Sequence, residues 1–247
     1  MFLALNLSAA GVWATRNNGD LHFDAIVAFF TLWYLVILTG RVSYAQFNPA
    51  LTLVWLFRSQ KGHFTRLRYG FPYFAAEFIG AILGGLIVWW IKDQVGYPSI
   101  PDNSNVAKAC VFEILGSFTL ISVILIVSEK DTKVSDILAV NGIIIGLGLI
   151  VTIFLTQGVS GAGINPAVSF GLTLAEYART GNSSVLDDLW IYMTMPLIGA
   201  FIALLFHELN VRKTLIILAP KEPQKRQETS ADNIVVKSQV RLVDPAE

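Results

Sequence analysis

Two short stretches of the chain share residue types that could bind a polar solute. Both copies read Asn-Pro-Ala: Asn48, Pro49, Ala50 and Asn165, Pro166, Ala167. Asparagine is a favoured N-cap, whose side-chain oxygen accepts a hydrogen bond from the first helical turn, and proline is tolerated at the first helical position. Each copy therefore predicts the start of a helix. Such a start presents unpaired N–H groups and about half a positive charge to whatever lies in front of it.

Long apolar segments surround these two motifs. The chain has 247 residues, of which 54% are hydrophobic and 15% charged, a composition typical of membrane proteins. We expect membrane spans over residues 25–40, 71–91, 109–128, 137–156 and 186–209. The helices that the motifs open, to residue 57 and to about residue 177, are too short to cross a bilayer.

The N-terminal segment 1–13 is apolar but has only about half of the roughly 20 residues that a span requires. We expect a first span that is short or truncated. A signal peptide is the alternative, although the segment lacks the basic start that such peptides carry.

The two halves of the chain repeat each other. Ile79-Gly80-Ala81 in the first half is matched by Ile198-Gly199-Ala200 in the second, at nearly the interval that separates Asn48 from Asn165. Three spans per half is an odd number, so the second copy enters the membrane upside down, and the functional site of such inverted repeats lies at the midplane. We expect an all-α membrane domain over residues 1–210, with repeats at about 1–92 and 108–210, and a charged, disordered tail over 211–247.

Basic residues in the short loops predict the orientation. One side of the membrane would hold Arg58, Lys61, Arg66, Arg68, Lys130, Lys133, Arg212 and Lys213. The positive-inside rule then places both termini in the cytosol. The opposite side would carry the sequon Asn182-Ser183-Ser184, a possible glycan acceptor for which an unmodified loop is the alternative.

Enzyme chemistry has no support in the sequence. The single cysteine, Cys110, excludes an internal disulfide and a cysteine-based metal site. His22, His63 and His207 do not have metal-ligand spacing, and there is no phosphate-binding loop, nucleophile elbow or carboxylate pair. The net charge of zero gives no sign of nucleic-acid binding. We therefore expect no catalytic residue, metal, cofactor or nucleic-acid partner.

Two Asn-Pro-Ala motifs, each following its own apolar segment in a separate half, resemble the aquaporin or major intrinsic protein family. The resemblance covers about residues 2–210. It implies a six-span bundle with two re-entrant half-helices, assembled as a homotetramer in the lipid bilayer. It also implies passive conduction of water, with glycerol, urea, ammonia and hydrogen peroxide as further candidate solutes. Asn48 and Asn165 would be the central donors, and the positive helix starts would oppose cations, hydronium included.

In this family a constriction outside the second motif sets selectivity, and it usually includes an arginine directly after the alanine. Here that residue is Val168, and the other filter positions fall on Ala28, Ile153 and Ala162. All four are small or aliphatic, so we expect a wider and less polar filter than in strict water channels. Ile153, Ala162 and Val168 resemble the pattern of plant tonoplast intrinsic proteins, whereas Ala28 does not. Aquaglyceroporins resemble the chain less, because they carry arginine and aspartate where Val168 and Ser169 stand.

Two glutamates lie inside apolar segments, where an unpartnered carboxylate costs about 2.5–3.5 kcal/mol on insertion scales. Glu113 matches a family glutamate that accepts hydrogen bonds from the re-entrant backbone, which implies a supporting role, with a proton relay as the alternative. We expect Glu77 to be buried against the amide groups of the neighbouring loop. The first span lacks the glutamate that would mirror Glu113.

Other departures from the family pattern leave a second function open. Tyr44 stands where the family has glycine, and together with Arg41 it could narrow the cytosolic mouth. The alternative hypothesis is a degenerate, non-conducting member that serves as a structural subunit, with other membrane subunits as partners. An ion-coupled transporter is a third possibility, but it needs midplane charges that the sequence mostly lacks.

Overall fold

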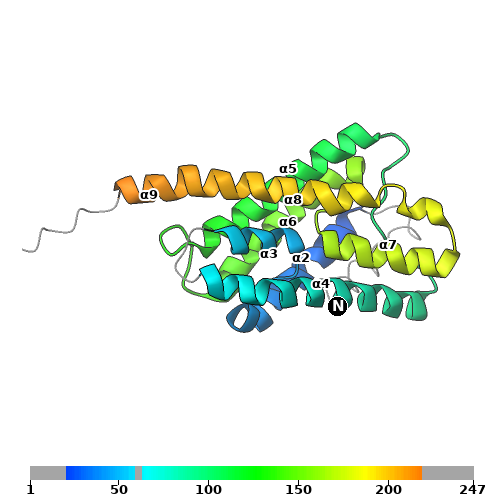
Figure 1. Cartoon of the computed structure of the whole chain (residues 1–247), viewed down its shortest axis with the longest axis horizontal. Helices are drawn as coiled ribbons and strands as arrows, with labels where there is room; N and C mark the ends of the chain where they lie inside the picture. The colour runs from blue at the N-terminus through cyan, green and yellow to red at the C-terminus, as the bar shows by residue number, and fades with distance from the viewer. Residues whose placement is uncertain (1–20, 59–62, 219–247) are drawn as a thin grey trace, which may run out of the picture. The chain divides into compact units, whose positions relative to one another are not determined.

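The computed structural model describes residues 21–58 and 63–218, and within these ranges the regular elements are all helical. Its helices are α2 (Leu21–Ser43), α3 (Pro49–Phe57), α4 (His63–Lys92), α5 (Val106–Ser128), α6 (Leu138–Ser160), α7 (Pro166–Thr180), α8 (Leu189–Phe206) and α9 (Arg212–Leu218) (Figure 1). A 3-10 turn at Ser183–Leu186 precedes α8, and a π-helical turn at His207–Val211 follows it. The predictions for residues 1–13, for Lys61 and for residues 219–247 concern parts of the chain outside the described residues.

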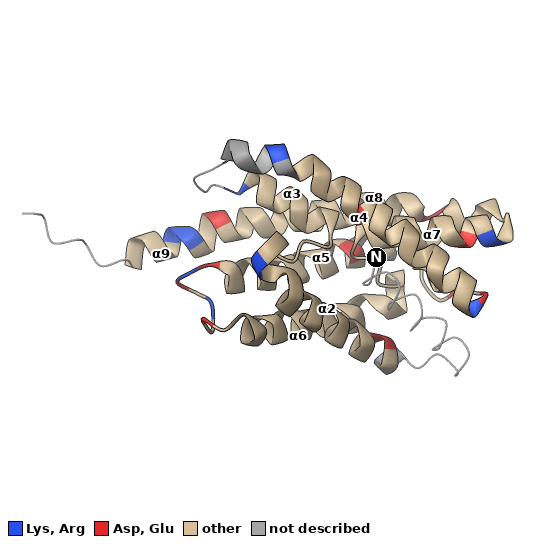
Figure 2. Cartoon of the chain, turned by 90° about the horizontal axis from the view of Figure 1, so that it is seen from below, with Lys and Arg blue, Asp and Glu red and all other residues tan. Residues whose placement is uncertain are grey.

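Five described segments are long and apolar enough to cross a membrane. They are Phe23–Ser43, Gly70–Lys92, Val106–Ser128, Leu138–Ser160 and Ser183–Leu218. Four of the five spans expected within the described residues lie inside these segments, and the fifth, 137–156, begins one residue before its segment. Figure 2 shows that charged residues gather mainly near the ends of these helices, as expected for segments whose middles lie in hydrocarbon.

The two short helices, α3 and α7, pack in ways that mirror each other. Helix α3 contacts α4 and α8, and helix α7 contacts the same two helices. Helix α2 of the first repeat packs along α6 of the second, and α5 packs on both α6 and α8. Because α2 corresponds to α6 and α4 to α8, these contacts have the symmetry that an inverted repeat requires.

Close helix approaches depend on glycine at two positions. A Cβ on Gly171 of α7 would collide with the backbone of Ala81 in α4, and a Cβ on Gly199 of α8 would collide with the carbonyl of Ile114 in α5. Small residues let helices approach this closely in membranes, where van der Waals packing replaces the hydrophobic effect as the main attraction. The half-helix α7 is therefore held tightly against α4, and the long helices α5 and α8 approach each other equally closely.

The chain after α8 differs from the prediction for its first residues. We expected a charged, disordered tail from residue 211, but α9 is helical over Arg212–Leu218. The difference has a local cause, because Leu215, Ile216, Ile217 and Leu218 form an apolar run that favours helix over solvated coil. Contacts divide the chain into the units Met1–Thr214 and Leu215–Glu247, and all that follows concerns the first.

Candidate functional site

Each short helix starts at its predicted asparagine cap. The side-chain oxygen of Asn48 accepts a hydrogen bond from the backbone N–H of Ala50 at 2.9 Å. The side-chain oxygen of Asn165 accepts from Ala167 at 3.1 Å and from Val168 at 3.2 Å. Both asparagines have extended backbone angles and are followed by proline at the first helical position. The local chemistry of the Asn-Pro pair thus sets both helix starts.

The two helix starts are joined to each other by a reciprocal pair of hydrogen bonds. The Nδ2 of Asn48 donates to the carbonyl of Ile164 at 3.2 Å, and the Nδ2 of Asn165 donates to the carbonyl of Phe47 at 2.8 Å. Each carbonyl belongs to the residue just before the other asparagine. An amide nitrogen carries two N–H groups, so each side chain keeps a second donor beyond this bond.

A cavity of about 1380 Å³ runs past this junction, and both asparagines line it. Its lining includes Tyr44 and Arg58 toward the predicted cytosolic end, and Asp24 and Gln157 toward the opposite end. Between the ends the wall is largely apolar, with Leu32, Val36, Leu51, Leu120, Leu149 and Ile153. Non-helical backbone at membrane depth is tolerated where it lines such a cavity.

Three of the four expected filter residues line this cavity. They are Ile153, Ala162 and Val168, whereas Ala28 is fully buried in an apolar cluster with Ile153 and is not part of the lining. Val168 belongs to a different buried apolar cluster, which also contains Val95 and has Tyr97 packed against it. Among the described lining residues Arg58 is the only cation, and it comes from the C-terminal end of α3. The outer part of the described cavity wall therefore carries no fixed positive side chain.

Glu113 of α5 holds the loop that leads into α7. Its Oε1 accepts from the Ser160 hydroxyl at 2.6 Å and from the Gly163 N–H at 2.8 Å, and its Oε2 accepts from the Ile164 N–H at 2.5 Å. The side chain is fully buried. These contacts fix the backbone directly before Asn165.

Glu77 of α4 serves the first loop in a similar way. Its Oε1 accepts from the hydroxyl of Thr52, in the first turn of α3, at 2.7 Å, and a backbone hydrogen bond joins it to Asn48. The glutamate thus contacts the first helix start from α4 rather than from a first span. This position explains how the first re-entrant loop is supported although residues 1–13 contain no glutamate.

Both loops enter their helices through non-glycine residues with positive φ. Tyr44 and Ala45 have φ of 58° and 50°, and Ala162 and Ile164 have φ of 55° and 51°. Left-handed backbone costs a residue with a Cβ roughly 1–2 kcal/mol, so these loops hold strain at the cavity wall. Tyr44 is 75% exposed and lines the cavity, whereas Arg41 is exposed and is not part of the lining.

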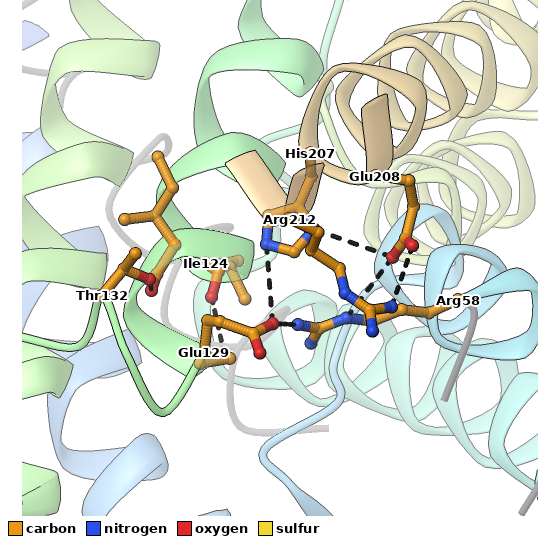
Figure 3. A network of polar contacts seen from close by, with 9 residues as sticks. Arg58, Ile124, Glu129, Thr132, His207, Glu208 and Arg212 are labelled. Carbon is orange, nitrogen blue, oxygen red and sulfur yellow. Dashed lines mark hydrogen bonds and ion pairs between the residues drawn. The ribbon is translucent and has the colours of Figure 1, made fainter. Parts of the chain in front are cut away.

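A buried ionic cluster lies where α3, α5 and α8 end (Figure 3). Arg58, whose side chain has no exposed area, forms an ion pair with Glu129, and its Nε lies 3.9 Å from Glu208. Glu208 also pairs with Arg212 at 2.9 Å, and His207 lies between the two glutamates. The sequence indicated only a basic loop here. Burial of Arg58 could not be foreseen, because its partners come from distant helix ends.

Removing the negative charge of Glu129 from this cluster should destabilise the helical bundle. In Glu129→Gln, the buried Arg58 keeps only the more distant Glu208 as a charged partner, and the hydrogen bond to a charged group that it loses is worth about 1.5–3 kcal/mol. We expect a clear fall in the thermal unfolding midpoint of the purified protein in detergent. Asp136→Asn is the matched control, because Asp136 pairs with Lys133 in an exposed loop and should leave the midpoint unchanged. Equal midpoints for wild type and Glu129→Gln would contradict a stabilising role for the cluster.

Three polar residues of the cavity were not singled out by the sequence. Asp24 and Gln157 hydrogen-bond to each other at 3.2 Å across α2 and α6, and Ser169 of α7 is fully buried beside Val168. No motif marks Asp24 and Gln157, since their meeting depends on how α2 and α6 pack. Within residues 21–58 and 63–218, no group of His, Cys, Asp and Glu side chains is arranged to hold a metal ion.

Comparison with known proteins matches residues 1–207 to the family described as major intrinsic protein. The chain is 31% identical over 237 residues to aquaporin NIP3-1 of Arabidopsis thaliana, covering 87% of this chain and 68% of that protein. It is 28% identical over 189 residues to aquaporin PIP2-4 of Oryza sativa subsp. japonica, covering 73% and 63%. Across eight such relatives the chain spans 61% to 70% of the relative's own length.

Among solved structures, the fold matches that of the aquaglyceroporin from Plasmodium falciparum with a TM-score of 0.71. The match covers 88% of this chain and 96% of that one, at 18% sequence identity. At this identity the likeness concerns the fold, and it supports the helical bundle with two half-helices that the sequence predicted.

Proposed function

Since the chain belongs to the major intrinsic protein family, whose members are integral multi-pass membrane proteins and channels rather than enzymes, we propose that it is a passive channel for water and small neutral solutes. The observation that carries the proposal is the junction of Asn48 and Asn165 beside one cavity whose lining includes residues from both ends of the bundle. A solute that accepts hydrogen bonds would meet their remaining amide donors at mid-depth.

The same junction would exclude cations. Both half-helices begin there, and each start contributes about half a positive charge. In a narrow path of low dielectric, these charges oppose hydronium and metal cations while leaving neutral molecules unaffected. The pore would thus conduct without coupling to an ion gradient.

The lining of the outer constriction supports a broader range of solutes than water alone. Ile153, Ala162 and Val168 provide no side-chain donors, so water gains no advantage there over glycerol, urea, ammonia or hydrogen peroxide. Permeability to each solute in proteoliposomes would test this range. Water permeability above that of empty vesicles supports the channel. Permeability equal to that of empty vesicles for water and for every solute tested contradicts it.

A non-conducting structural subunit is the competing proposal, and Tyr44 is the observation that favours it. The exposed tyrosine lines the cavity at the predicted cytosolic mouth, with its ring 6.4 Å from that of Trp55. We expect Tyr44→Gly to raise water permeability by about twofold to fivefold, because it removes the ring and suits the positive φ. Arg41→Ala, a neighbour outside the cavity lining, is the control. No permeability in either the wild type or Tyr44→Gly would favour the structural role.

The proposal also covers the oligomeric state of the protein and the end of its channel domain. We expect a homotetramer in which the channel domain ends at about residue 210 and both termini face the cytosol. Large apolar side chains such as Phe30, Leu38, Trp90 and Phe201 are exposed on the helices, where lipid or a neighbouring subunit would cover them. The mass of the detergent-solubilised protein, measured by light scattering, would test the tetramer.

A further inference from the structure

Three polar side chains form a chain of contacts in the cavity wall beside the first helix start. Gln46 lies two residues before Asn48, Thr52 lies in the first turn of α3, and both line the cavity. Glu77 of α4 contacts Thr52 but is not part of the lining. The Oγ1 of Thr52 lies 3.1 Å from the Oε1 of Gln46 and 2.7 Å from the Oε1 of Glu77. Thr52 therefore joins a residue of the cavity wall to a carboxyl group behind that wall.

The hydroxyl of Thr52 has only one hydrogen, so it cannot donate to both neighbours at once. An ionised Glu77 only accepts and takes this hydrogen, so Thr52 can only accept from Gln46. The NH₂ end of the Gln46 amide then turns toward Thr52, and its carbonyl oxygen faces the cavity. A protonated Glu77 donates to Thr52 instead, Thr52 donates to the Oε1 of Gln46, and the NH₂ group faces the cavity. One proton on Glu77 thus decides which end of the amide a solute meets.

The surroundings of Glu77 leave the state of its carboxyl group to burial and hydrogen bonding. Its Oε2 is buried and has no hydrogen-bond partner among the described residues. Burial opposes the charged form, whereas the hydrogen bonds from Thr52 and Asn48 favour it. The described titratable side chains on α4 and on the helices packed against it are Arg68, Tyr73 and Lys92 of α4, Arg58 directly after α3, and Glu176, Tyr177 and Arg179 of α7.

These groups do not neutralise Glu77. Arg58 is paired with Glu129, and Arg179 with Glu176. Arg68 and Lys92 lie more than two helical turns from Glu77 along α4. Within the described part of the chain, no charged side chain therefore fixes the protonation state of Glu77.

Gln46 is in a position to act on water in the cavity. It is half-buried, and Thr52 is its only hydrogen-bond partner among the described residues. The amide donors of Asn48 and Asn165 point at the oxygen of a water molecule at the junction, so the hydrogens of that water point away from it. A carbonyl oxygen on Gln46 can accept the next hydrogen bond, whereas an NH₂ group places a donor where an acceptor is needed.

We propose that Gln46 helps to set the rate of water conduction, and that the protonation of Glu77 turns its amide through Thr52. This inference rests on the proposed channel function and adds control by pH to it. The proton is taken up from water and returned to water, so the relay needs no other reactant. The ionised relay conducts water faster, and the protonated relay conducts it more slowly.

The first test measures osmotic water permeability in proteoliposomes between about pH 5 and about pH 8, where folded proteins are commonly most stable. We expect the wild type to conduct at least about twofold faster at the higher pH, the effect of one hydrogen bond gained. Glu77→Gln should be slow at both pH values, because its NH₂ group donates to Thr52 as the protonated acid does.

Thr52 variants separate the relay from other titrating groups. Thr52→Val keeps the shape of the side chain but has no hydroxyl, so the difference between the two pH values should fall to that of Glu77→Gln. Thr52→Ser keeps the hydroxyl and should keep the difference. Thr39→Val is the matched control, because Thr39 bonds within α2 to the carbonyl of Leu35 and lies outside the cavity lining.

Infrared spectra at the two pH values test the relay without a conducting pore. We expect acid to produce a protonated-carboxyl band that is missing in Glu77→Gln. Acid should also shift a side-chain amide band that is missing in Gln46→Leu, and this shift should be lost in Thr52→Val.

The outcomes distinguish the relay from the channel. Water permeability no greater than that of empty vesicles at both pH values would overturn the proposed function, and the infrared shifts would still decide the relay. Equal pH dependence in the wild type and Thr52→Val, or an amide shift that survives in Thr52→Val, would overturn only the relay.

Discussion

Glu113→Leu is expected to lose most of the folded channel. The substitution removes the acceptor of three hydrogen bonds from the loop before Asn165. Ser160 has a second acceptor in the carbonyl of Thr156, so its hydroxyl is partly compensated. The N–H groups of Gly163 and Ile164 would remain buried without their partner, at about 1–3 kcal/mol each. The sum, about 2–6 kcal/mol, is a large part of the 5–15 kcal/mol that holds a typical protein folded.

The measurement is the yield of monodisperse protein in detergent together with its thermal unfolding midpoint. Glu113→Gln is the graded control, because it keeps one carbonyl oxygen but turns an NH₂ group toward backbone donors. It should lie between wild type and Glu113→Leu. A Glu113→Leu protein with the wild-type midpoint and water permeability would show that the re-entrant loop does not depend on this carboxylate.

Val168→Arg is expected to change which solutes pass rather than whether the protein folds. Val168 lines the cavity directly after the second motif, so an arginine there would add length, five N–H donors and a fixed charge to the constriction. We expect urea and glycerol permeability to fall at least about tenfold, which corresponds to about 1.4 kcal/mol in the barrier. Water is smaller and can use the added donors, so its permeability should change by no more than about twofold.

Val168→Leu separates bulk from charge in the same assay. It lengthens the side chain without adding a donor, and its effect on urea should be smaller than that of arginine. Unchanged urea and glycerol permeability in Val168→Arg would mean that the constriction lies elsewhere in the cavity.

Local chemistry was enough to predict the two helix starts. An Asn-Pro pair sets an N-cap from its own residues, so the starts at Asn48 and Asn165 follow without knowledge of the fold. The reciprocal bonds to Ile164 and Phe47 could not be predicted in this way, because they depend on how two loops meet from distant parts of the chain. Glu113 was assigned from family resemblance, since its sequence context shows only a carboxylate in an apolar run.

Residues whose environment is set by distant helices were the ones that sequence patterns missed. Arg58 looked like part of a basic loop, but Glu129 and Glu208 enclose it. Asp24 gave no signal, because its partner Gln157 belongs to the other repeat. The helix from Arg212 to Leu218 was missed because the charge of the whole tail outweighed its short apolar run.

Water and proton permeability, measured in the same wild-type proteoliposomes, test most directly whether two opposed helix starts form a conducting pore. We predict osmotic water permeability well above that of empty vesicles, together with proton permeability no greater than theirs. Vesicles that swell no faster than empty ones, or that leak protons as readily as they pass water, would contradict a pore in which Asn48 and Asn165 admit neutral solutes and reject cations.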